Sequence, residues 1–360
     1  MNPAAGSRIV VGMSGGVDSS VAAALLKDQG YDVIGVMLHL WSDNDTENRC
    51  CAPDAQQEAR SIAAHLEIPF YVIDAQDAFY KAVVQPFIDG YAGGTTPNPC
   101  LNCNRQIRWK FLWSRAEALG AEYISTGHYA RIGISENGNY QLLKNPDPEK
   151  DQSYFLHVLT QDDLSRTVFP LAEYAKTEVR QLARGFGLSV ADRPDSQDLC
   201  FVGHENYRDF LRKIDPTLLI PGPILDSDGI KLGEHQGLAD YTIGQRKGLG
   251  IAGPEPYYVL EKDLVNNALI IGFKNKLGRS SFNADSINWI SGNSPTKPIK
   301  SDIRIRYKSK SVPGIITPLD NNLAEIDLRD PIPDITPGQA AVFYNEYVCL
   351  GGGIIQRNAL

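Results

Sequence analysis

A glycine- and serine-rich segment near the N-terminus carries the strongest chemical signal of the chain. It runs from Gly12 to Ser20 with the sequence GMSGGVDSS, between an apolar run and a helix-like stretch. Backbone N–H groups at such a strand-to-helix turn form a cradle for anions, and the serine hydroxyls add donors. Asp18 would repel a phosphate, so we expect it to hold a Mg²⁺ that bridges phosphate groups. No lysine follows the glycines, which excludes a Walker A loop.

A second signal is a C-x-x-C motif, Cys100 and Cys103 in NPCLNCN, ahead of a helix predicted over Asn104–Leu119. Cys103 is therefore expected at or near a helix N-terminus, close to Arg105 and Arg108. Both features favour the thiolate, which is the reactive form of cysteine. Cys200 lies far away in the sequence.

The spacing of these cysteines leaves three kinds of site open. The first is a catalytic pair in which one cysteine carries a persulfide and the other resolves it. Cys100, Cys103 and Cys200 would alternatively hold an iron–sulfur cluster with one iron left open for sulfide. The same three thiols with His204 would make a structural zinc site. We expect Cys349 to be strand core and the pair Cys50–Cys51 to be incidental.

Hydrophobic patterning divides the chain into three predicted domains. Residues 1–205 alternate strand and helix signals, which predicts a doubly wound parallel sheet that carries the catalytic site. Residues 206–278 are rich in glycine and proline, as in a small loop-rich domain. Residues 279–360 carry only strand signals, which predicts an antiparallel β-barrel. The predicted C-terminal strands are Ser286–Ile290, Ile303–Ser309, Ala324–Leu328, Ala340–Tyr344 and Val348–Ile355.

The composition is that of a soluble globular protein, with 42% hydrophobic and 22% charged residues. No apolar run is long enough for a membrane span, and the N-terminus does not resemble a signal peptide, so we expect no membrane partner and a cytoplasmic location. The net charge of -8 argues mildly against nucleic acid as a partner. A local basic patch would reverse that argument.

The stretch Lys297–Lys310 is the best candidate for such a patch, because it contains six cations and only Asp302 as an acid. A strand here would place Ile303 and Ile305 toward the core. The opposite face would be a basic ridge made of Arg304, Arg306, Lys308 and Lys310. The alternative is an edge strand protected by its charge.

The glycine-rich segment matches the PP-loop signature S-G-G-x-D-S of ATP pyrophosphatases, which cleave ATP to AMP and pyrophosphate. Taken with the cysteines, the chain resembles the tRNA-specific 2-thiouridylases of the MnmA family over nearly its whole length. Further motifs that carry the resemblance are STGHYAR (125–131), KDQSY (150–154), DLCF (198–201), TIGQRKG (242–248) and RIRY (304–307).

The resemblance implies an adenine nucleotide α-hydrolase-like fold, use of ATP with Mg²⁺, and 2-thiolation of the wobble uridine of tRNA. Sulfur would come from a cysteine desulfurase or a sulfur-relay protein. Cys103 would be the nucleophile and Cys200 the persulfide carrier, with a transient disulfide between them. Asn98, Pro99 and Cys100 would contact the target base. ATP would be bound by Gly12, Met13, Ser14, Gly15, Gly16, Val17, Asp18, Ser19, Leu38 and Gly127. tRNA would be contacted by His128, Lys150, Asp151, Gln152, Arg306, Tyr307 and Gln339.

One position departs from the family pattern, because many members carry Asp where this chain has Cys100. A third thiol at this position keeps a [4Fe–4S] cluster open beside the persulfide mechanism. Two other functions compete with thiolation. An amide-forming PP-loop ligase or synthetase would need neither the cysteine pair nor a basic C-terminal strand. A non-catalytic RNA-binding or metal-carrying protein would not need the intact Ser14, Asp18 and Cys103.

Overall fold

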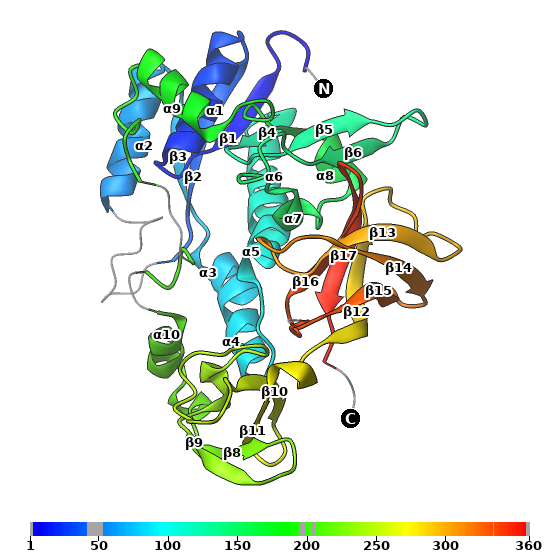
Figure 1. Cartoon of the computed structure of the whole chain (residues 1–360). Coiled ribbons are helices and arrows are strands. Elements are labelled where there is room, and N and C mark those ends of the chain that lie inside the picture. The colour runs from blue at the N-terminus through cyan, green and yellow to red at the C-terminus, as the bar shows by residue number, and fades with distance from the viewer. Residues whose placement is uncertain (1–2, 42–52, 195–198, 204–205, 334, 358–360) are drawn as a thin grey trace.

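The computed structural model describes residues 3–41, 53–194, 199–203, 206–333 and 335–357. These residues form three sheets: a parallel one at the N-terminal end, a small one in the middle of the chain and a barrel at the C-terminal end (Figure 1). Cys50, Cys51 and His204 lie outside the described residues. Within the described part of the chain, no helix has the length and apolar character needed to cross a membrane.

The N-terminal sheet has five parallel strands in the order β3-β2-β1-β4-β7. They are β1 (Arg8–Gly12), β2 (Asp32–His39), β3 (Phe70–Asp74), β4 (Tyr123–Thr126) and β7 (Thr167–Val168). Helices α1 (Val17–Asp28), α2 (Pro53–His65) and α9 (Lys176–Gly185) pack on the side of Ile9 and Val11, and α6 (Leu112–Ala118) packs on the side of Val10. Helices on both faces explain why β1 is apolar from Ile9 to Val11, and they confirm the predicted doubly wound fold.

Two long helical segments connect β3 to β4, and both contain π-helical turns. The first consists of α3 (Gln76–Phe79), η1 (Tyr80–Val84) and α4 (Gln85–Ala92), with Pro86 accommodated just after the π turn. The second consists of α5 (Pro99–Asn102), η2 (Cys103–Phe111) and α6. This second segment was predicted to begin at Asn104 but begins at Pro99, because Asn98 caps it by accepting a hydrogen bond from the backbone N–H of Cys100. π-Helical turns are rare and are often found at functional sites.

The middle of the chain folds around a four-stranded sheet in the order β10-β11-β8-β9. Its glycine content had predicted loops, and long loops do join these strands. Its helices are α10 (Tyr207–Ile214), η3 (Pro216–Leu218), η4 (Leu238–Asp240) and η5 (Lys274–Lys276). Its strands are β8 (Gly222–Asp226), β9 (Lys231–His235), β10 (Tyr258–Asp263) and β11 (Ala268–Gly272).

The C-terminal strands form the expected antiparallel barrel, which closes because β12 pairs with both β15 and β17. A hairpin of β5 and β6, from the N-terminal half of the chain, extends the sheet by pairing with β17. The strands are β5 (Arg131–Ile134), β6 (Tyr140–Leu143), β12 (Arg279–Trp289), β13 (Ile299–Arg304), β14 (Val312–Leu319), β15 (Leu323–Ile332), β16 (Ala340–Asn345) and β17 (Val348–Ile355). Between the hairpin and β7 lie α7 (Ser153–Leu156) and α8 (Gln161–Ser165).

The predicted strand over Ile303–Ser309 is wrong, and with it the basic ridge. Strand β13 ends at Arg304, and the chain then bends through residues 305–309. Ile303 and Ile305 are buried as expected. Arg304, however, turns inward, where its guanidinium lies 3.3 Å from the Asp151 carboxylate and 5.2 Å from the centre of the Tyr344 ring. The buried carboxylate of Asp151 thus binds Arg304, which was expected to form part of the exposed basic ridge.

Candidate active site

The glycine-rich loop joins the carboxyl end of β1 to the N-terminus of α1. Gly16 is the N-cap and has no side chain to satisfy the first N–H groups of the helix. The Ser14 N–H donates to Ser19 Oγ at 3.1 Å, which folds the loop back over the helix. Gly15 has φ +70°, and a Cβ there would lie 2.5 Å from the Ala55 carbonyl oxygen. The loop therefore requires glycine and presents backbone donors to an anion.

Two residues predicted to line the ATP site lie at the carboxyl ends of β2 and β4, the two strands that flank β1. Gly127 follows β4, and a Cβ there would lie 2.6 Å from the Ser19 backbone nitrogen, so only glycine allows the end of β4 to approach the loop. Leu38 lies near the carboxyl end of β2. From β1 the chain adds β2 and β3 on one side of the sheet, and it then adds β4 and β7 on the other side. Open α/β sheets bind their ligands at such a switch point, which here lies between β1 and β4.

The three candidate cysteines occupy different environments. Cys100 is exposed in the first turn of α5, whereas Cys103 begins η2 and is buried. Cys200 is partly buried and packs on the same hydrophobic cluster as Cys103, together with Phe79 and Phe201. Leu38 also packs against this cluster. The two cysteines expected to exchange sulfur therefore pack on one hydrophobic cluster, although they lie almost a hundred residues apart in sequence.

The metal alternatives are not supported by the arrangement of these residues. Among the residues that the structure describes, no group of three or more His, Cys, Asp or Glu side chains is arranged to hold a metal ion. Cys100, Cys103 and Cys200 thus do not form the three-thiol set that a cluster requires. The zinc alternative also involves His204, which lies outside the described residues. Cys349 is buried in β17 as predicted, and burial raises its thiol pKa to about 12.

The loop that carries Asn98 is held by the barrel. The Thr96 N–H donates to the Pro337 carbonyl, and the Gln339 side chain donates to the Thr96 carbonyl at 2.7 Å. Asn98 also lines a cavity of about 460 Å³ between α5 and the end of β17. The loop that carries Asn98, which is predicted to contact the target base, is therefore positioned jointly by the N-terminal and C-terminal parts of the chain.

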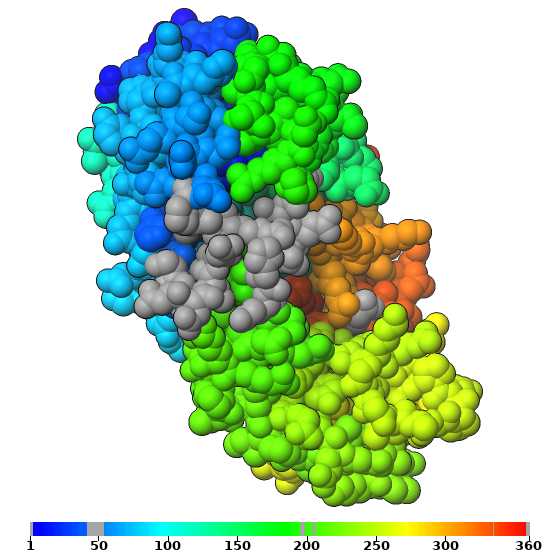
Figure 2. Space-filling view, turned by 90° about the vertical axis from the view of Figure 1, so that its left-hand side faces the viewer, coloured from blue at the N-terminus to red at the C-terminus, as the bar shows by residue number. Residues whose placement is uncertain are grey.

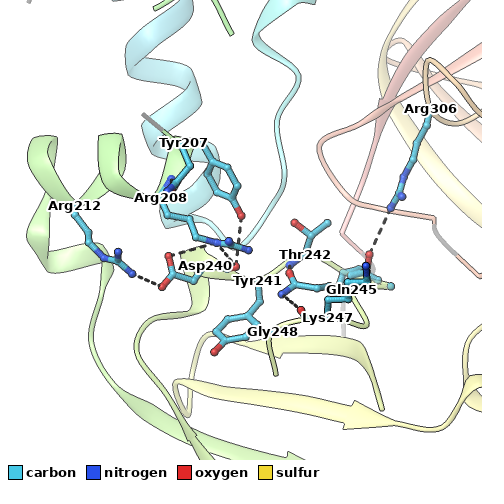
Figure 3. Close-up of a pocket in the computed structure, with 13 residues that line it drawn as sticks. Tyr207, Arg208, Arg212, Asp240, Tyr241, Thr242, Gln245, Lys247, Gly248 and Arg306 are labelled. Carbon is cyan, nitrogen blue, oxygen red and sulfur yellow. Dashed lines mark hydrogen bonds and ion pairs between the residues drawn. The ribbon is translucent and has the colours of Figure 1, made fainter. Parts of the chain in front are cut away.

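A larger cavity of about 830 Å³ lies where the middle of the chain meets the barrel (Figure 3). Four cations from three segments line it: Arg208 and Arg212 on α10, Lys247 in the loop between η4 and β10, and Arg306 after β13. Asp240, the acidic side chain in its lining, lies 2.9 Å from Arg212 and 3.9 Å from Arg208. The excess of positive charge suits a phosphate-bearing ligand.

Comparison with known proteins identifies the family. Residues 7–204 match the family described as tRNA methyl transferase HUP domain, residues 208–273 the tRNA methyl transferase PRC-barrel domain, and residues 279–355 the aminomethyltransferase beta-barrel domain. The tRNA-specific 2-thiouridylase MnmA of Roseiflexus castenholzii is 47% identical over 370 residues, covering 98% of this chain and 100% of that protein. The chain belongs to the MnmA family. The MnmA of Natranaerobius thermophilus is 45% identical and covers 98% of both chains.

A solved 4-thiouridine synthetase in complex with RNA and ATP is also similar, at 17% identity over 59% of this chain and 51% of that chain, with a TM-score of 0.36. This similarity is too distant to support an argument about the site. The MnmA resemblance expected from the sequence motifs is confirmed.

The residues that MnmA resemblance assigns to tRNA contact gather at the junction of sheet and barrel. Asp151 is 2% exposed and accepts hydrogen bonds from Ser153 and Arg304. Gln152 exchanges hydrogen bonds with the Tyr129 backbone. These two side chains position the junction. Of the remaining residues in this set, Lys150 is partly exposed, and Tyr307 packs on Phe155 with ring centres 4.4 Å apart.

His128 is also a buried member of this set, at 7% exposed. Its Nδ1 lies 2.8 Å from Thr126 Oγ1, and its ring lies beside Trp109 and Phe169. Burial, and then the nearby Arg108, hold the pKa of His128 well below its usual range, so the ring is neutral. In this structure His128 therefore packs among aromatic side chains at the end of β4.

Sequence reasoning missed three residues at the phosphate loop. Lys176 Nζ lies 2.7 and 2.8 Å from the two carboxylate oxygens of Asp18, and the Tyr129 hydroxyl donates to Asp18 at 2.7 Å. Arg193 donates to the Gly15 carbonyl at 2.9 Å. Lys176 and Arg193 are more than 150 residues from the loop, so no local motif connects them. The available signal was a lysine at the start of a helical stretch, where the helix dipole disfavours a cation.

Proposed function

We propose that this protein is a tRNA-uridine 2-sulfurtransferase that uses ATP to thiolate the wobble uridine of tRNA in the cytoplasm. The main support for the proposal is that Cys103 and Cys200 pack on one hydrophobic cluster, in a fold whose parallel sheet leads into the PP-loop. A ligase or a binding protein would have no use for two thiols, distant in sequence, on one hydrophobic cluster. The high identity to MnmA proteins along the whole chain supports the same reaction.

The first step activates the base. The uridine O2 attacks the α-phosphorus of ATP, the bond from that phosphorus to the bridging oxygen breaks, and pyrophosphate leaves with the electron pair. Backbone donors from Ser14 to Ser19 would hold the phosphates at the α1 N-terminus. Asp18 would hold a Mg²⁺ that offsets phosphate charge, a role that its carboxylate fits because it is partly exposed at the loop.

The second step delivers sulfur. A cysteine desulfurase or a relay protein loads Cys200 as a persulfide. The Cys103 thiolate attacks the inner sulfur, which forms a Cys103–Cys200 disulfide and releases hydrosulfide. Hydrosulfide adds to C2 of the adenylated uridine, AMP leaves, and loss of a proton gives the thiocarbonyl. A dithiol reductant must then reduce the disulfide before the next turnover.

RNA binding would involve all three parts of the chain. The cavity lined by Arg208, Lys247 and Arg306 would bind backbone phosphates, while Asn98, Pro99 and Cys100 would contact the target base. We assign residues 1–205 to a catalytic domain, and residues 206–278 and 279–360 to domains that contact tRNA. Figure 2 shows the catalytic domain in the upper half and the central domain in the lower half, with the barrel visible between them at one side.

A tRNA-dependent assay tests the function. Purified protein, unmodified tRNA, ATP and a sulfide source should yield AMP, pyrophosphate and 2-thiouridine in equal amounts. Cleavage of ATP that does not depend on tRNA would favour a ligase acting on a small molecule. Binding of tRNA without any turnover would favour a non-catalytic protein. Iron and acid-labile sulfide are measured in the same anaerobic sample, because activity that follows the iron content would replace the persulfide step.

A further inference from the structure

A lysine and an arginine reach the phosphate loop from the segment that follows β7. We propose that Lys176 and Arg193 bind the β- and γ-phosphates of ATP and stabilise the leaving pyrophosphate. This inference rests on the proposed function. It names two catalytic cations for a loop that contains none, since the sequence from Gly12 to Ser20 has Asp18 as its charged residue.

The charge of the reaction calls for such cations. When the α–β bond of ATP breaks, negative charge accumulates on the leaving pyrophosphate. Backbone N–H groups at a helix N-terminus contribute only partial charges, equivalent to roughly half an elementary charge. Enzymes that transfer phosphoryl groups generally add a positioned Lys or Arg to stabilise this charge. In this structure, Lys176 contacts Asp18 and Arg193 contacts Gly15, so both cations reach the loop.

The positions of both cations are fixed by the fold. Lys176 is the first residue of α9, and its side chain is 12% exposed. Arg193 is held by its own backbone, because Arg180 donates to the Arg193 carbonyl at 2.9 Å and to the Ala191 carbonyl at 2.7 Å. Helix α9 also packs on α1, the helix that begins at the loop. Both cations are therefore anchored to elements that contact the loop or its helix.

Lys176 occupies a position that is locally unfavourable. A cation at a helix N-terminus opposes the dipole, and a poorly exposed ammonium loses hydration. The Asp18 carboxylate offsets both costs in the absence of nucleotide. Once ATP is bound, Lys176 would turn from Asp18 to a phosphate oxygen, and the Asp18 carboxylate would be available to hold Mg²⁺. A residue that breaks a local rule at a ligand site is expected where function requires it.

The experiment compares ATP and AMP binding by calorimetry for the wild type and Lys176→Gln, without divalent cations. Loss of a charged contact to the β- or γ-phosphate should weaken ATP binding about 10- to 100-fold. AMP binding should change less than about threefold, because AMP lacks those phosphates. Arg193→Gln should show the same selectivity, and Lys176→Arg should restore part of the ATP affinity. Lys27→Gln, at an exposed lysine of α1, is the matched control.

A double variant separates phosphate binding from a merely structural ion pair. If Lys176 only neutralised Asp18, the penalty of Lys176→Gln would vanish in an Asp18→Asn background. A penalty for ATP that persists there supports direct phosphate contact. Equal losses for ATP and AMP, or loss of the penalty in that background, would overturn the inference. A wild type that does not bind ATP overturns the proposed function as well, whereas one that binds ATP with this selectivity but does not thiolate tRNA overturns the function alone.

Discussion

Arg306→Gln tests whether the basic cavity binds tRNA phosphates. The Arg306 guanidinium lies 2.6 Å from Thr336 Oγ1 and 3.5 Å from the Ile243 carbonyl, so the barrel and the central sheet orient it together. Each phosphate that a protein neutralises contributes about 0.7 to 0.9 to the slope of log K against log salt. If Arg306 contacts one phosphate, the variant should lose that amount of slope.

The magnitude follows from this slope. Loss of one charged contact should weaken tRNA binding about tenfold at about 0.05 M salt, equivalent to ~1.4 kcal/mol. A fourfold rise in salt should then narrow the difference between wild type and variant by about threefold. The assay is fluorescence anisotropy with labelled tRNA at several salt concentrations.

A matched control separates charge from packing. Thr336→Val removes the hydroxyl partner of Arg306 but leaves the guanidinium charge in place. It should retain the wild-type salt slope even if it weakens binding slightly. An Arg306→Gln variant with unchanged slope would refute the phosphate contact and move the RNA footprint away from this cavity. The same slope loss in both variants would show that packing of the junction, and not the charge, is what matters.

Three further predictions concern sulfur transfer, nucleotide binding and stability. Cys103→Ser and Cys200→Ser should each reduce 2-thiouridine formation more than about 100-fold, measured by mass spectrometry of digested tRNA, with tRNA affinity retained; an active Cys200→Ser enzyme would contradict its carrier role. Gly127→Ala should push the backbone of the phosphate loop, cost about 1–3 kcal/mol and weaken ATP binding, whereas Gly185→Ala, where a Cβ meets nothing within 4 Å, should be harmless in the same calorimetric titration. Burial, and then a nearby arginine, lower the pKa of Lys262 to about 7 from 10.5, so the unfolded chain binds more protons between these values and stability rises with pH across that window. Lys262→Met should therefore raise the thermal midpoint at about pH 6.5 by more than at about pH 10, and an equal gain at both pH values would exclude a buried charge.

The parallel sheet and its phosphate loop were predictable because their signals are local. An apolar strand, two glycines and a helix follow each other within 20 residues, and each element has its own pattern. The start of the helix near Cys103 was less predictable. Its boundary depends on the Asn98 side chain, which caps a backbone N–H and lets the helix begin at Pro99. Single capping bonds move boundaries by a few residues without changing the pattern of apolar positions.

The residues that sequence reasoning missed share a different property, because their partners lie far away in the chain. Arg304 was expected to face solvent, since its strand alternates correctly, but the buried carboxylate of Asp151 redirects it. Lys176 was not singled out, since Asp18 stands 158 positions earlier. Patterns of hydrophobicity show which face of an element is buried. They do not show which charged group from another element is buried against it.

The helix start also changes which thiol the helix terminus affects. Because α5 begins at Pro99, Cys100 lies in the first turn, and Cys103 lies beyond it, where the effect of the dipole has decayed. The helix N-terminus therefore lies closer to Cys100 than to Cys103. Cys103 is surrounded by apolar side chains, which limit its contact with small solutes. Because Cys200 packs on the same cluster, this arrangement favours reaction of Cys103 with a persulfide carried by the protein over reaction with solutes.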